Sequence, residues 1–98
     1  MERRSYKISP IFINGHYVEE VIIDPHVDKH KDHIDDDLIL ALVERLSEAR
    51  TQISDYKDRF SYFVSLIDYE DRSYKMVWLI EDLKFYIGVI TAFKDRRI

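Results

Sequence analysis

The sequence predicts an α+β fold of element order ββαβββ, with one main helix packed on an antiparallel sheet. Three observations predict it. An Asn-Gly pair separates two strand-like runs near the start, a helical stripe of apolar residues follows, and three alternating runs fill the second half. The 98 residues are expected to form a single domain, 1–98, because a chain of this length leaves no room for a second core.

The first two strands are expected at 6–13 and 16–23, on either side of Asn14-Gly15. Asn-Gly between two β-rich runs is typical of a type I′ hairpin turn, whose two central residues need positive φ. Pro10 has no N–H to donate to a neighbouring strand. The first strand is therefore expected at an edge of the sheet.

The main helix is expected to begin at Asp35, whose side chain suits an N-cap. Asp36 and Asp37 then place negative charge on the positive end of the helix dipole. Apolar residues recur at helical spacing through this segment: Ile39, Leu42, Val43, Leu46, Ala49 and Ile53. The helix should fade around 50–54, and residues 54–59 are expected to form a connection.

Three further strands are expected at 60–67, 74–80 and 85–93, joined by short polar turns. Their apolar residues alternate with period two, which is typical of an antiparallel β-meander. Both faces of the last strand are apolar, so this strand is expected near the centre of the sheet. Gly88 in its middle indicates a bulge or a close backbone approach.

Composition narrows the class of protein. The chain is 46% hydrophobic and 13% aromatic, which is too apolar for a disordered protein. It has no cysteine, so disulfides and thiolate zinc sites are excluded and a reducing compartment fits. We expect no secretory signal, because residues 1–9 contain no apolar run, and no apolar run approaches the roughly 18 residues of a membrane span. We therefore expect a soluble, cytoplasmic protein with no membrane contact.

Charge is distributed unevenly along the chain. The formal net charge is −4, which counts against a generic nucleic-acid binder, since those are usually basic. Acidic residues concentrate in 19–37 and 68–71, whereas basic residues gather at the two ends, as Arg3, Arg4, Lys94, Arg96 and Arg97. If the two ends meet on one face, that face would be basic on an acidic body.

Two stretches carry a resemblance to a known family. "DPHVDKHKDHI" stands before the helix, and "YIGVITAFKDRR" stands at the end of the sequence. With the order of elements, they resemble the RelE-like toxin superfamily, most closely its BrnT-type branch. Asp24-Pro25 and Lys29-His30 match the end of a strand and the Lys-His pair before the first helix of that pattern. Residues 89–97 match its hydrophobic strand that continues into a basic segment.

The resemblance implies a RelE-like fold and a small ribonuclease toxin of a toxin–antitoxin pair. Such an enzyme needs no metal or other cofactor, and its partners are RNA and an antitoxin protein. It needs an acid, a base and cations on the reacting phosphate. His30 would be the acid or base, with Arg96 as the second catalytic residue. Lys29, Lys94 and Arg97 would bind RNA phosphate, which requires the loop before the helix to lie beside the end of the last strand.

Two alternatives remain open at this point. The negative net charge favours a catalytically inactive member of the fold, acting as a protein-binding regulatory module or as a homodimer built on the hydrophobic sheet. The third reading is a His/Asp metal site, because histidines and aspartates alternate before the helix, as Asp24, His26, Asp28, His30, Asp32 and His33. The same residues are also typical of an exposed loop, and 35–37 are fully explained by helix capping.

Overall fold

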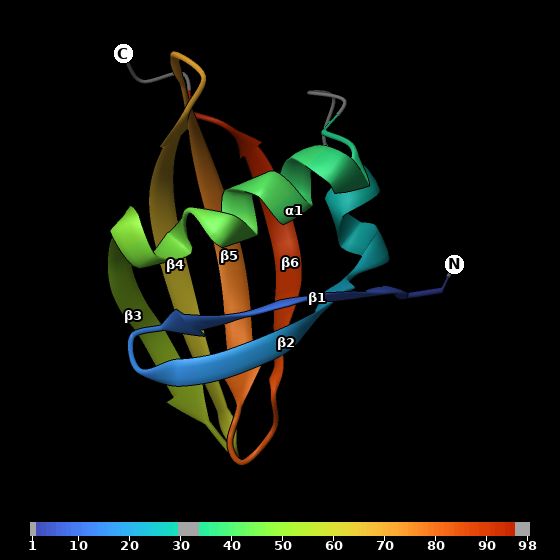
Figure 1. The fold of residues 1–98 in the computed structure, drawn as a ribbon, viewed down its shortest axis with the longest axis vertical. Coiled ribbons are helices and arrows are strands. Elements are labelled where there is room, and N and C mark those ends of the chain that lie inside the picture. Colours follow the sequence, from blue (N-terminus) through green and yellow to red (C-terminus); the bar gives the residue numbers. More distant parts are fainter. Residues whose placement is uncertain (1, 30–33, 96–98) are drawn as a thin grey trace.

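The computed structural model describes residues 2–29 and 34–95 of the chain. In these residues, six strands form one mixed sheet with the order β1-β2-β6-β5-β4-β3, and helical segments lie against it (Figure 1). The elements are β1 (Arg4–Ile13), β2 (His16–Ile23), η1 (Pro25–Lys29), α1 (Asp36–Glu44), η2 (Leu46–Glu48), β3 (Arg50–Lys57), β4 (Phe60–Tyr69), β5 (Arg72–Glu81) and β6 (Tyr86–Lys94).

The predicted fold, ββαβββ with one main helix on an antiparallel RelE-like sheet, is wrong. Four strands follow the helix instead of three, and the sheet is mixed because β2 and β6 run parallel. Strands make up 62% of the structure and helices 18%, so the sheet dominates the fold and the helix is a minor element.

The error comes from the segment after α1. The helix ends at Glu44, and the residues expected to complete it form η2 and β3. Ile53, the last member of the expected helical stripe, is 74% exposed on β3. β3 pairs with β4 from Arg50 opposite Leu66 to Lys57 opposite Phe60. Pairing along a whole strand outweighs the weak preference of a few helically spaced residues.

Other expectations are confirmed. Asn14 and Gly15 have φ values of 52° and 79° in the hairpin turn, as a type I′ turn requires. β1 is an edge strand and β6 lies inside the sheet. A Cβ atom on Gly88 would lie 3.0 Å from Leu79 Cδ1, so the glycine marks a close approach between neighbouring strands.

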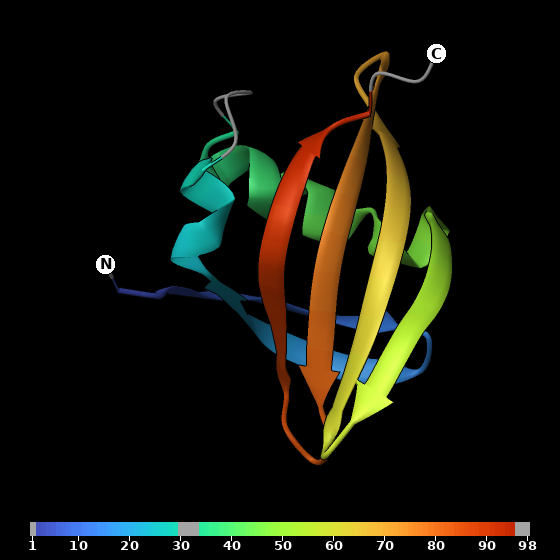
Figure 2. The ribbon, with the colours of Figure 1, turned by 180° about the vertical axis from the view of Figure 1, so that it is seen from behind.

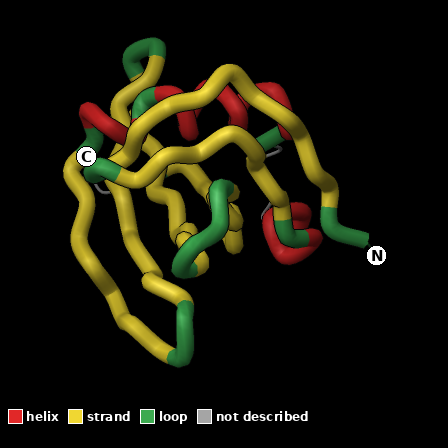
Figure 3. Tube along the Cα trace, turned by 60° about the horizontal axis from the view of Figure 1, so that its bottom comes forward, coloured by secondary structure: helices red, strands yellow, loops and turns green. Residues whose placement is uncertain are grey.

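The hairpin and the helix cover the same face of the sheet. In Figure 1, β1 and β2 cross in front of β3–β6, and α1 crosses above them. Figure 2 shows the opposite face of β3–β6, over which no described element lies. In Figure 3 the strands curve around the interior. The largest fully buried side chains are core residues from every layer, among them Trp78, Ile13, Ile23, Ile39, Leu42, Met76 and Ile87.

The one α-helix in the described part of the chain, α1, has nine residues. No helix there is long and apolar enough to cross a membrane.

Candidate functional site

The segment before α1 packs against the last strand. The backbone N–H of Asp24 donates to the carbonyl oxygen of Val89 at 2.9 Å, and η1 lies against β6. Val27 of η1 is only 2% exposed and belongs to the core. Figures 1 and 2 show η1 beside β6, with the start of α1 at the end of the molecule where β6 ends. η1 and β6, the described elements that precede the candidate residues, are therefore neighbours.

Three of the candidate residues fall outside the described part of the chain: His30, Arg96 and Arg97. The other two stand at the limits of described elements, since Lys29 is the last residue of η1 and Lys94 is the last residue of β6. Lys94 pairs with Tyr74 of β5 in the sheet register. The proposed roles of these five residues stay predictions.

Arg4 on β1 makes a double ion pair that the sequence did not suggest. Its guanidinium donates to both carboxylate oxygens of Asp28, at 2.9 and 3.1 Å. It also donates to both carboxylate oxygens of Asp36, at 2.7 and 2.9 Å. The Tyr6 hydroxyl donates to Asp36 as well. One arginine thus holds η1 and the first turn of α1 on the same strand.

This cluster is strongly coupled electrostatically. The hydrogen bonds from Arg4, together with that from Tyr6, hold the pKa of Asp36 below its usual range. The same carboxylates raise the pKa of Arg4, and the bond to Asp36 raises the pKa of Tyr6. One cation against two carboxylates leaves the cluster negative. Arg4 therefore does not contribute to the basic face expected from the chain ends, because two carboxylates offset its charge.

The helix start is capped as predicted. The Asp35 carboxylate accepts a hydrogen bond from the backbone N–H of Leu38 at 2.9 Å, and Asp35 has the extended backbone of an N-cap. Capping therefore accounts for Asp35. Asp36 has a different role, as the partner of Arg4 and Tyr6.

The described residues, 2–29 and 34–95, do not support the metal-binding hypothesis. Within them, no group of three or more His, Cys, Asp or Glu residues could hold a metal ion. The backbone N–H of His26 donates to the Asp24 carboxylate at 2.8 Å, which is a local turn contact. His30, Asp32 and His33 lie outside these ranges.

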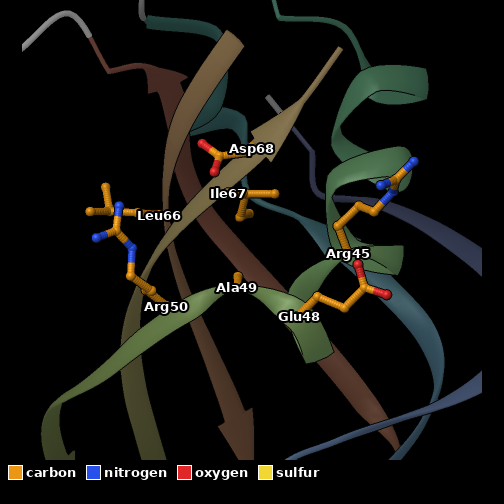
Figure 4. Close-up of a pocket in the computed structure, with 7 residues that line it drawn as sticks. All are labelled: Arg45, Glu48, Ala49, Arg50, Leu66, Ile67 and Asp68. Atoms are coloured by element: carbon orange, nitrogen blue, oxygen red, sulfur yellow. The ribbon is translucent and has the colours of Figure 1, made fainter. Parts of the chain in front are cut away.

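A hollow of about 240 Å³ lies beside η2 and the start of β3 (Figure 4). It is lined by Arg45, Glu48, Ala49, Arg50, Leu66, Ile67 and Asp68. In Figure 4, Arg45 and Arg50 extend to opposite sides of the hollow, with Ile67 and Ala49 between them. The Arg45 guanidinium also lies 5.3 Å from the centre of the Tyr69 ring. These charged groups do not converge on one point, so the hollow does not form a catalytic site.

A second hollow, of about 380 Å³, lies on the uncovered face of the sheet. Its lining residues are Arg3, Ile22, Asp24, Phe60, Tyr62, Leu79, Glu81, Tyr86, Gly88, Val89 and Ile90. The Glu81 carboxylate accepts a hydrogen bond from the Tyr86 hydroxyl at 2.7 Å. It also forms an ion pair with Arg59, at 2.9 Å. Burial and the Glu81 contact raise the pKa of Tyr86 to about 12. Its main acid is already paired, so this hollow suits apolar contact better than proton transfer.

Comparison of the chain with protein-family models, curated proteins and solved structures found no match. The candidate function therefore depends on the residues and their arrangement alone.

Proposed function

We propose that the chain is a metal-independent endoribonuclease that acts as the toxin of a toxin–antitoxin pair. The observation that supports this is the packing of η1 against β6. His30 follows directly on Lys29, the last residue of η1, and Arg96 comes two residues after Lys94, the last residue of β6. An acid–base group and phosphate-binding cations thus follow, in sequence, on two neighbouring elements.

The proposed chemistry is cleavage by the ribose 2′-oxygen. That oxygen loses its proton and bonds to the adjacent phosphorus, and the bond from phosphorus to the leaving 5′-oxygen breaks as this oxygen gains a proton. His30 takes the first proton or supplies the second, and water exchanges the other, because an unperturbed imidazole has a pKa near neutrality. Arg96 stabilises the charge that develops on the phosphate, since a guanidinium can donate two parallel hydrogen bonds to it. Lys29, Lys94 and Arg97 bind the phosphates on either side of the cleaved bond. The proposed antitoxin would cover this surface.

The experiment that tests the proposal is RNA cleavage by the purified protein, with and without EDTA and with and without ribosomes. His30→Ala and Arg96→Ala should each lower the cleavage rate by roughly 10²-fold or more, as loss of a proton-transfer group or a charge-stabilising donor typically does. The matched control is His16→Ala. The His16 imidazole is hydrogen-bonded at 3.0 Å to the carbonyl oxygen of Lys84. Lys84 lies in the turn between β5 and β6, far in sequence from η1.

Each outcome has a clear meaning. Cleavage that survives EDTA, fails in His30→Ala and persists in His16→Ala supports the proposal. Cleavage abolished by EDTA moves the function to the His/Asp metal reading. Folded protein that cuts no RNA under any of these conditions overturns the nuclease proposal. Growth arrest on expression, relieved by His30→Ala but not by His16→Ala, would extend a positive result to toxicity.

A second proposal is a binding module without catalysis, and one observation favours it. Three carboxylates stand in or beside η1 and at the start of α1, those of Asp24, Asp28 and Asp36, and two cations among the described residues pair with them, Arg3 with Asp24 and Arg4 with the other two. Such an acidic surface repels RNA phosphate. Filter binding of single-stranded RNA over a range of salt concentrations separates the two proposals. The nuclease should bind more weakly as salt rises, whereas a protein-binding module should not bind RNA at any salt concentration.

A further inference from the structure

Five large hydrophobic side chains are exposed in the described part of the chain. They are Phe12 (63% exposed), Ile53 (74%), Tyr56 (58%), Leu83 (93%) and Phe85 (55%). Single exposed apolar residues are normal on protein surfaces, but contiguous groups of them mark interaction sites. The five exposed side chains would therefore mark an interaction site only if they are contiguous on the surface.

The structure links them into one strip. The rings of Phe12 and Tyr17 lie 5.5 Å apart, and those of Tyr17 and Phe85 also lie 5.5 Å apart. Leu83 stands two residues before Phe85 in the turn between β5 and β6. The Tyr56 hydroxyl donates to Asp82 of that turn at 2.6 Å, which brings the edge strand β3 to the same place.

Ile53 extends this strip along β3. Ile53 pairs with the buried Phe63, and Tyr56 pairs with Ser61, two residues earlier on β4. Both therefore lie on the face of the sheet that carries the core. In Figure 1, α1 and the hairpin cross this face, and the lower ends of the strands continue beyond them. The exposed apolar strip, defined as Phe12, Tyr17, Ile53, Tyr56, Leu83 and Phe85, is thus the uncovered margin of the core face.

The strip is large enough to form most of an interface. With roughly 100–150 Å² exposed on each of the five side chains, it offers on the order of 600 Å² of apolar surface. Each partner of a standard-size protein interface contributes about 800 Å². The neighbouring backbone edge of β3 supplies further area, because β3 ends the sheet and seven of its eight residues are exposed.

The backbone at Leu83 adds a conformational cost to the exposure of this side chain. Leu83 has φ of 65°, a left-handed conformation that suits Gly or Asn and is unfavourable for a leucine. Its side chain gains nothing in the isolated chain to offset this cost, because it is 93% exposed. A leucine at this position gains free energy only when another molecule buries it.

Charge around the strip identifies the partner. The chain as a whole carries a formal net charge of −4, which opposes contact between two copies over most of the surface. The exposed charged residues of 12–19, 50–59 and 81–85 balance, however, as four cations and four anions: Arg50, Lys57, Arg59, Lys84, Glu19, Asp55, Asp58 and Asp82. Two copies can therefore meet here without net repulsion.

We propose that the exposed apolar strip is the interface with a second copy of this chain. A strand that ends a sheet can pair antiparallel with its own copy, which gives a two-fold symmetric contact. β3 suits this because it contains no proline and its one register irregularity, between Ile53 and Asp55, leaves most of the strand regular, whereas the opposite edge, β1, is interrupted by Pro10. The dimer is independent of the proposed nuclease activity.

The test is the mass of the full chain in solution, by sedimentation equilibrium over a wide range of protein concentration. The wild type should approach twice its 11.9 kDa mass as concentration rises. Leu83→Asn should weaken dimerisation by roughly tenfold or more, the effect of exposing one buried leucine. Asn also tolerates the positive φ, so the dilute monomer of this variant should be as stable as the wild type or more stable.

A Leu83→Asn variant that dimerises more weakly, but whose monomer is at least as stable as the wild type, has not lost its dimer through misfolding. Phe12→Ser tests the other end of the strip. Leu66→Asn is the matched control, because Leu66 lies on the uncovered opposite face of the sheet, where it lines a separate hollow. A wild type that stays monomeric at every concentration overturns the proposal. A dimer that survives both Leu83→Asn and Phe12→Ser overturns it as well, and its loss in Leu66→Asn would then place the interface on the other face.

Discussion

Arg4 connects three parts of the chain that are far apart in sequence. From β1 it reaches Asp28 in η1 and Asp36 in α1, and its side chain is 32% exposed. Its effect on stability therefore differs from that of an ordinary surface ion pair, which contributes little. The guanidinium satisfies two carboxylates at once, and its removal leaves both without their main donor.

We expect Arg4→Ala to lower the free energy of unfolding by about 1–3 kcal/mol, because hydrogen bonds to partly buried charged groups are lost. Urea denaturation followed by circular dichroism measures this. Arg3→Ala is the control, because the Arg3 side chain is 74% exposed and its Nε lies 4.0 Å from Asp24 Oδ2. This substitution should lower the free energy of unfolding by less than about 0.5 kcal/mol. Equal effects of the two substitutions would contradict the structural role of Arg4.

The same cluster predicts a dependence of stability on pH. The pKa of Asp36 is lower in the folded protein than its ordinary value, so the stabilisation is complete above the unfolded pKa of about 3.9. It is lost as pH falls through the lower, folded pKa. Urea denaturation of the wild type between neutral and strongly acidic pH should therefore show falling stability below about pH 4. In Arg4→Ala this acid-dependent loss should be smaller, and parallel curves would contradict the assignment.

At the scale of the elements, a buried polar chain joins three neighbouring strands. The indole N–H of Trp78 on β5 donates to Ser65 Oγ on β4 at 2.8 Å. Ser65 Oγ in turn lies 2.6 Å from Thr51 Oγ1 on β3. Ser65 and Trp78 are both 0% exposed, so the indole N–H has no access to water if the serine oxygen is removed.

We therefore predict that Ser65→Ala destabilises the fold by about 1–3 kcal/mol, the cost of a buried donor without an acceptor. Chemical denaturation measures the change. In a Trp78→Phe background the same substitution should cost clearly less, because no N–H remains to be satisfied. A double-mutant cycle with no coupling between the two positions would show that the hydrogen bond does not stabilise the sheet.

The elements also show what the sequence can and cannot predict. Alternation located β4, β5 and β6, and Asn14-Gly15 located the first hairpin, because these signals are local. β3 was missed because its pairing with β4 is a tertiary interaction, and nothing in 50–57 alternates clearly between apolar and polar. The parallel pairing of β2 with β6 is also non-local. The Arg4 cluster was missed for the same reason, since its partners lie 24 and 32 residues away.

At the scale of the whole molecule, the proposed dimer predicts a concentration-dependent thermal midpoint. Association stabilises the folded state by mass action, so the midpoint of the wild type should rise with protein concentration. Leu83→Asn should flatten this dependence, whereas Leu66→Asn should leave it intact. Differential scanning calorimetry over a wide concentration range measures it. A wild-type midpoint that does not change with concentration would contradict the dimer independently of sedimentation.

The position of β6 between β2 and β5 has a consequence for how the protein is made. A nascent chain that has been synthesised only as far as Glu81 lacks the strand that joins the β1–β2 hairpin to the β3–β5 meander in one sheet. β6 is synthesised after both, so part of the apolar face of each stays exposed to water and to chaperones until it emerges. If this chain is an RNA-cutting toxin, its activity would be delayed until β6 has left the ribosome, and the unfinished chain would be harmless to the messenger that encodes it.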